Sequence, residues 1–99
     1  MTIVKEQNDT TLTISLEGRL DTTTSPQLEG ELRTAVSGIT ELVFNLEKLD
    51  YISSAGLRVL LSAEKTMKRQ GGMVIRNVKP EIMEIFEVTG FVDILTIEE

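Results

Sequence analysis

Two adjacent serines, Ser53 and Ser54, stand directly before an apolar run that has the spacing of a helix. A serine in this place can accept hydrogen bonds from the backbone N–H groups that the first turn of a helix leaves unpaired. The alternating residues Leu42, Phe44 and Leu46 precede the serines and predict a strand. The sequence therefore places two hydroxyl groups where a strand is followed by a helix, a common location of function in α/β domains.

The residue types that usually carry catalysis are scarce. The chain has no cysteine and no histidine, which excludes disulfides, thiolate metal sites and cysteine nucleophiles and removes the commonest general base. It also lacks a glycine-rich phosphate loop of the G-x-x-x-x-G-K-[ST] type. A pair of catalytic carboxylates stays open, because no spacing singles one out. We expect no enzyme, no catalytic residue, no cofactor and no metal site.

Charge and length limit the partners. The chain has 99 residues with 10 basic and 16 acidic side chains, which gives a net charge of −6. This charge argues against binding to nucleic acid or to anionic membrane surfaces. No apolar run approaches the roughly 20 residues that a membrane span needs, and no signal peptide is evident at the N-terminus. We expect one cytoplasmic domain over residues 1–99, with no nucleic-acid or membrane partner.

Hydrophobic spacing predicts the order β-β-α-β-α-β-α-β. The strands are expected over residues 2–7, 11–16, 40–46, 73–75 and 92–97, with a polar turn over 47–50. The helices are expected from Thr24 or Ser25 to about Val36, from Ser54 or Ala55 to about Gln70, and from Pro80 to Gly90. Strands that alternate with helices require crossover connections, and the first two strands form a hairpin. The fold class is therefore α/β with a mixed, mostly parallel sheet.

The second predicted helix carries a basic strip. At 3.6 residues per turn, Arg58, Ser62, Lys65 and Arg69 share one side of this helix, and Ser54 falls on the same strip one turn earlier. A solvated face is the ordinary explanation for such a strip, because basic side chains near a helix C-terminus complement its dipole. The alternative is that Ser54 and Arg58 act together.

At this point the residues resemble a known family. The segment over residues 49–57, Leu-Asp-Tyr-Ile-Ser-Ser-Ala-Gly-Leu, is similar to the signature of bacterial anti-sigma factor antagonists, the STAS-domain family. The segment over residues 18–21, Gly-Arg-Leu-Asp, resembles the upstream motif of that family. The order of elements, the length and the Gly90-Phe91 segment are also similar. The resemblance covers nearly the whole chain and implies a single STAS domain over residues 1–99.

The resemblance implies a mechanism called partner switching. An anti-sigma factor serine kinase binds the unmodified antagonist and releases its sigma factor, and the same kinase then uses ATP to phosphorylate a serine at the start of the second helix. The modified antagonist dissociates, and a serine phosphatase restores it. Residue by residue, Ser54 takes the acceptor position, with Ser53 as second choice. Ser53 stands where the family commonly has an aspartate.

The expected docking surface joins the residues of both motifs with the basic strip. It comprises Asp21, Thr22, Ser53, Ser54, Gly56, Leu57 and Arg58. Without the resemblance, Asp21 is an ordinary turn or capping residue. Two other functions stay open. One is a STAS interaction module without phosphorylation in a larger sensory or transport-linked assembly, which Ser53 at the aspartate position favours, and the other is a small enzyme or nucleotide binder.

Overall fold

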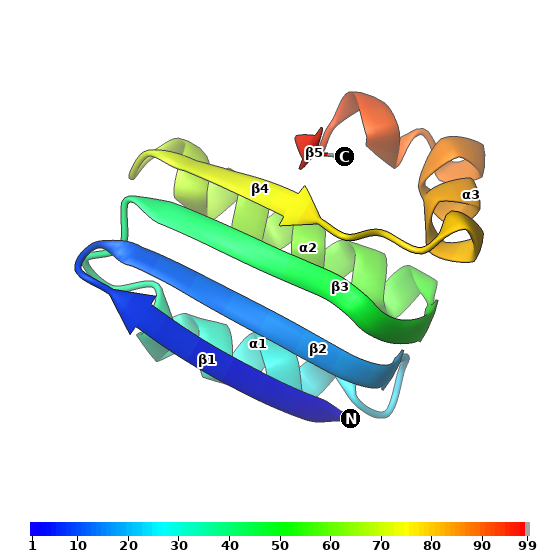
Figure 1. Cartoon of the computed structure of the whole chain (residues 1–99), viewed down its shortest axis with the longest axis horizontal. Helices are drawn as coiled ribbons and strands as arrows, with labels where there is room; N and C mark the ends of the chain where they lie inside the picture. The colour runs from blue at the N-terminus through cyan, green and yellow to red at the C-terminus, as the bar shows by residue number, and fades with distance from the viewer. Residues whose placement is uncertain (99) are drawn as a thin grey trace.

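A mixed sheet forms the centre of residues 1–98, the part of the chain that the computed structural model describes (Figure 1). Its strands lie in the order β1-β2-β3-β4-β5, with β1 antiparallel to β2 and all other neighbours parallel. The elements are β1 (Thr2–Asn8), β2 (Thr11–Leu20), α1 (Ser25–Ala35), β3 (Glu41–Ile52), α2 (Ser54–Lys68), β4 (Gly72–Arg76), α3 (Pro80–Thr89), the 3-10 helix η1 (Phe91–Asp93) and β5 (Ile97–Glu98). The predicted fold class and the N-terminal hairpin are confirmed.

Helices α1 and α2 cover one face of the sheet, and the core lies between them and the strands (Figure 1). Alternation along the strands explains this arrangement, because every second residue of β2, and of β3 as far as Leu46, faces the helices. Leu12 pairs with Leu42 and Ile14 pairs with Phe44, and all four side chains are buried. Within residues 1–98, none of the helices is long and apolar enough to cross a membrane.

Strand β3 is longer than the sequence suggested. The prediction ended it at Leu46 and placed a polar turn over residues 47–50, which is wrong. The strand continues to Ile52 because β2 also continues, to Leu20, and the two strands stay paired. Two register shifts insert extra residues into β3. Such bulges bend a strand, and they allow Leu49 and Ile52 to stay buried, at 0% and 2% exposure, amid polar neighbours.

The last predicted strand, over residues 92–97, is also wrong in most of its length. Residues 91–93 form the helix η1, and only Ile97 and Glu98 pair with β4. The carbonyl oxygen of Phe91 accepts hydrogen bonds from the backbone N–H groups of Ile94 and Leu95, so this segment forms a local helical turn and does not pair with β4. That turn buries the Leu95 side chain in the core. Gly90, at a φ of 81°, ends α3 as predicted.

The first turn of α2 packs unusually close to the sheet. A Cβ atom on Gly56 would lie 2.8 Å from side-chain carbons of Leu20 and Ile52 and 2.9 Å from the carbonyl oxygen of Leu20. That oxygen also accepts a 2.9 Å hydrogen bond from the backbone N–H of Ser53. The absence of a side chain at residue 56 therefore allows α2 to begin directly against the ends of β2 and β3.

The turn between β2 and α1 is organised by the Asp21 carboxylate. Its Oδ1 accepts 3.0 Å hydrogen bonds from the backbone N–H groups of both Thr23 and Thr24. Arg19 adds a charge contact, with Nε 3.7 Å from Oδ2. The hydrogen bond from the Thr24 backbone is the largest cause that holds the pKa of Asp21 below its usual value, because it stabilises the charged form. Asp21 is therefore a fixed negative charge that shapes the turn.

The close approach at Gly56 predicts a steric effect. We expect Gly56→Ala to lower the free energy of unfolding by about 1–3 kcal/mol, because the added carbon overpacks the contact with Leu20. Gly30→Ala in α1 is the matched control, since its Cβ would meet nothing within 4 Å. That control should gain up to about 1 kcal/mol from better helix propensity. Urea unfolding of the two variants measures both, and equal effects would contradict the steric explanation.

The Asp21 turn predicts a pH dependence. The folded pKa of Asp21 is lowered from 3.8, so its stabilising contribution is complete at neutral pH and is lost as the pH falls through the folded pKa. Asp21→Asn removes this contribution at every pH. The melting temperature of the variant should therefore lie furthest below that of the unmodified sequence near neutral pH, and the gap should narrow in acid. A difference in melting temperature that is the same in neutral and acidic buffer would contradict a stabilising role of the Asp21 charge.

Candidate functional site

The two serines before α2 have different roles. Ser53 is the N-cap residue, in an extended conformation, and its Oγ accepts a hydrogen bond of 3.4 Å from the backbone N–H of Gly56. Ser54 is the first residue of α2 and is exposed. Its hydroxyl takes no part in the capping hydrogen bond. One serine is thus committed to starting the helix, and the other presents its hydroxyl to solvent.

The fold brings most of the predicted site residues to one edge. Strands β2 and β3 are parallel, so their carboxyl ends meet at the same edge of the sheet. The Asp21 turn follows β2 there, and the serines follow β3. The hydrogen bond from Ser53 to Leu20 joins the two segments directly. Asp21 and Thr22 therefore border the start of α2, although they lie about thirty residues away in sequence.

Two of the predicted site residues lie inside the protein. Gly56 is buried against Leu20 and Ile52, and the Leu57 side chain is only 6% exposed and belongs to the core. Neither can present a side chain to a partner. Their place in the predicted surface is indirect, because they set the position of the α2 first turn and with it the direction in which Ser54 projects.

The charges around this edge are unevenly paired. Arg19 lies 3.7 Å from the Asp21 carboxylate and 4.3 Å from the centre of the Tyr51 ring, so it is held by an ion pair and a cation–π contact. Arg58 is exposed on α2, and none of the ion pairs formed among residues 1–98 includes it. The edge therefore offers one fixed carboxylate and one uncommitted guanidinium.

A groove of about 380 Å³ runs between α1 and α2 beside this edge. It is lined by Thr22, Ser25 and Pro26 on one side and by Ala55, Arg58 and Val59 on the other, with Glu29 and Ser62 further along. The Ser25 hydroxyl is buried and has no hydrogen-bond partner within the described residues. The sequence indicated Ser25 only as a possible cap, and the observed N-cap is Thr24. Nothing in the local sequence signals that this hydroxyl is enclosed.

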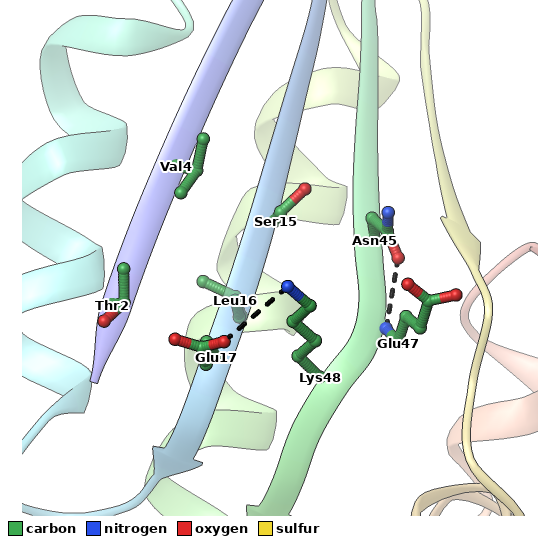
Figure 2. A pocket seen from close by; sticks show the side chains of 8 residues that line it. All are labelled: Thr2, Val4, Ser15, Leu16, Glu17, Asn45, Glu47 and Lys48. Carbon is green, nitrogen blue, oxygen red and sulfur yellow. Dashed lines mark hydrogen bonds and ion pairs between the residues drawn. The ribbon is translucent and has the colours of Figure 1, made fainter.

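A second hollow, of about 340 Å³, lies on the strands β1 to β3 (Figure 2). Its walls are Thr2, Val4, Ser15, Leu16, Glu17, Asn45, Glu47 and Lys48. Lys48 reaches across to Glu17, with Nζ 3.9 Å from Oε2, and Asn45 Oδ1 accepts a 3.1 Å hydrogen bond from the Glu47 backbone. The hollow forms where β3 bulges, which explains why sequence reasoning missed it. No predicted site residue lines it.

Comparison with known proteins gives the family. The family model described as STAS domain matches residues 2–99. BtrV of Bordetella bronchiseptica, described provisionally as an anti-sigma factor antagonist, is 44% identical over 61 residues, which cover 61% of this chain and 53% of BtrV. The chain thus spans about half the length of that relative. The anti-sigma-B factor antagonist of Bacillus subtilis is 28% identical over 93% of this chain and 85% of its own.

Solved structures show the same fold. The Bacillus cell fate determinant SpoIIAA, in its phosphorylated form, superimposes with a TM-score of 0.76 at 22% identity, over 99% of this chain and 92% of that one. An anti-sigma factor antagonist from Mycobacterium paratuberculosis gives a TM-score of 0.87 at 23% identity, over 97% and 83% of the two chains. The expected resemblance is confirmed, because the family model covers nearly every residue: the chain belongs to the STAS domain family.

Proposed function

We propose that this protein is an anti-sigma factor antagonist that works by partner switching in the cytoplasm. The unmodified form binds an anti-sigma factor kinase and frees a sigma factor, and phosphorylation of Ser54 ends that binding. One observation carries the proposal: Ser54 is exposed at the first position of α2, with its hydroxyl outside the capping hydrogen bond. The names of the B. subtilis and B. bronchiseptica relatives support the coarser function, antagonism of an anti-sigma factor.

Ser54 is a better acceptor than Ser53 for a physical reason. The Ser53 oxygen caps the helix, and a phosphoryl group on it would displace the hydrogen bond from Gly56. Modification of Ser53 therefore costs the helix its cap, a contribution of about 1 kcal/mol. The Ser54 hydroxyl can be modified without this loss. The proposal accordingly gives Ser54 the phosphate and Ser53 a positioning role.

A phosphate at this place changes docking and spares the fold. It adds about −1.5 to −2 charges and three strong acceptor oxygens. The N-terminal end of a helix tolerates an anion well, because its N–H groups and dipole favour negative charge. A partner packed closely on Ser54 meets the extra bulk and must desolvate a dianion. Each loss of about 1.4 kcal/mol weakens binding tenfold, so a modest penalty is enough to release the partner.

The docking surface that we propose consists of the exposed part of the edge. Thr22, Ser54 and Arg58 contribute to it as exposed residues, and Asp21 and Ser53 contribute as half-buried ones. Gly56 and Leu57 hold its shape from inside. The kinase recognises this surface in the unmodified form, and a serine phosphatase acts on the modified one. The protein itself supplies no catalytic group, because the chemistry belongs to these two partners.

The second function, a STAS interaction module without phosphorylation, has one observation in its favour. The residue before Ser54 is a serine, and its hydroxyl is engaged in capping, so no carboxylate from that position is available to orient the Ser54 hydroxyl. The labelling experiment below separates the two functions.

Labelling should fall on one serine. We expect incubation with ATP and the anti-sigma factor kinase encoded nearest to its gene to phosphorylate Ser54, as mapped by mass spectrometry. Ser54→Ala should abolish the label. Ser53→Ala should keep it and should unfold about 1 kcal/mol more easily, because it removes the cap. A label on Ser53, or no label on the intact protein, would count against this assignment.

Binding should follow the charge at residue 54. Ser54→Asp is expected to weaken the complex with the same kinase at least tenfold, or about 1.4 kcal/mol, in isothermal titration calorimetry. Thr66→Asp is the control, because it adds the same charge to the same helix about three turns away from Ser54 and outside the α1–α2 groove. Equal losses in the two variants would show that net charge, and not the position, governs the affinity.

A further inference from the structure

Arg58 is an unpaired cation in an acidic protein. The arginines 19, 33 and 76 lie within 4.0 Å of the carboxylates of Asp21, Glu29 and Glu98, respectively. Acidic side chains outnumber basic ones by 16 to 10, so carboxylates are abundant. Within residues 1–98 no ion pair reaches Arg58, Lys65, Lys68 or Arg69, and of these four only Arg58 lines the α1–α2 groove. Its guanidinium is free to bind an anion from outside.

The same groove holds a buried donor without an acceptor. Ser25 is 3% exposed, and its Oγ has no hydrogen-bond partner among residues 1–98. Buried hydroxyl groups are normally paired, because an unmade hydrogen bond costs stability. Ser25 lines the α1–α2 groove together with Arg58 and Thr22. The Oγ has almost no accessible surface, so a ligand in the groove that brings an acceptor would satisfy this hydroxyl after it rotates about χ1 toward the groove.

The two groups together select a carboxylate. A guanidinium binds a carboxylate through two parallel hydrogen bonds, and a carboxylate has lone pairs left for a hydroxyl donor. The apolar walls formed by Pro26, Ala55 and Val59 suit the methylene groups of an acidic side chain. Glu29 also lines the groove and is 3.4 Å from Arg33. Its negative charge disfavours a dianion more than a monoanion, which argues for a carboxylate over a phosphate.

We propose that the α1–α2 groove receives an acidic side chain of the anti-sigma factor, with Arg58 as its ion-pair partner and the Ser25 hydroxyl as a hydrogen-bond donor. This inference rests on the proposed function and names the chemistry that the partner must supply. Because the groove adjoins the start of α2, a carboxylate seated in it lies beside Ser54 when the complex forms.

Phosphorylation then acts on the same guanidinium. Ser54 and Arg58 are four residues apart on α2 and both are exposed. Side chains at this spacing are neighbours, with Cβ atoms about 5–6 Å apart. A phosphoserine at residue 54 pairs with Arg58 and withdraws it from the partner's carboxylate. The switch therefore removes an attraction as well as adding a repulsion.

The groove can be tested without the partner. N-acetylglutamate amide is the probe, and N-acetylglutamine amide is its neutral control. In NMR titrations the acidic probe should shift the Arg58 side-chain Nε–H signal and the Ser25 backbone signal, and the neutral one should not. Ser25→Ala should lower the affinity for the acidic probe severalfold. The variant should stay folded, because the hydroxyl that it removes is unpaired. Identical shifts with both probes would overturn the carboxylate site.

The affinity of the anti-sigma factor kinase tests the same groove in the complex. Arg58→Ala should weaken binding of the anti-sigma factor kinase at least tenfold. Arg69→Ala is the matched control, since it removes the same charge from the same strip three turns further along and lies outside the groove. If Ser54→Asp releases the kinase while Arg58→Ala and Arg69→Ala behave alike, the groove inference fails and the proposed function stands. If Ser54→Asp changes nothing, the proposed function fails, and the probe titration still decides the groove.

The proposed pairing of phosphoserine 54 with Arg58 can be measured separately. Phosphoserine can be placed at residue 54 by genetic encoding, which needs no kinase. Its second pKa is normally about 6, and a neighbouring cation lowers it because the dianion is favoured. In ³¹P NMR titrations this pKa should lie lower in the protein with Arg58 than in the Arg58→Ala variant. Equal values in the two proteins would overturn the competition between phosphoserine and partner.

Discussion

The contact between the first turn of α2 and the carboxyl end of β2 determines the rest of the site. A glycine at residue 56 leaves the Leu20 carbonyl oxygen room to accept the Ser53 N–H at 2.9 Å, within a helix start that packs against Leu20 and Ile52. This contact fixes both segments that border the edge, the Asp21 turn after β2 and the serines after β3. A larger residue 56 would push α2 away from the sheet, and the two motifs would no longer form one surface.

The same contact separates the roles of the adjacent serines. Because the Ser53 N–H is bound to β2 and its Oγ faces Gly56, this residue is held from two sides. Ser54 begins the helical turn, so its side chain leaves the surface in another direction. A pair of identical residues therefore becomes one structural group and one accessible group. The sequence alone could not make this distinction, because either serine satisfies the preference for a cap.

Much of the fold could be predicted, because alternation and helical spacing mark the core of β2, β3 and the helices. The failures have one physical cause, which is that tertiary pairing overrides local polarity. Residues 47–50 look like a turn, yet bulges keep them in β3 and bury Leu49. Residues 92–97 look like a strand, yet the Phe91 carbonyl closes η1. For the site, sequence motifs indicated Asp21 and Ser54, and helical spacing indicated Arg58. The enclosed Ser25 hydroxyl could not be predicted, because it depends on the packing of α1 against α2.

The arrangement of charges explains how a surface switch can act without unfolding the domain. Asp21 is held by two backbone N–H groups and stays negative, so it cannot adapt when a phosphate arrives nearby. Arg58 is the adaptable group, because its side chain is exposed and carries no ion pair among the described residues. In the proposed switch, a phosphate on Ser54 would meet a cation on the same helix, and its charge would be compensated locally. The proposed switch would therefore change only the anions that Arg58 binds, and it would release a partner that depends on this guanidinium while the core contacts stay the same.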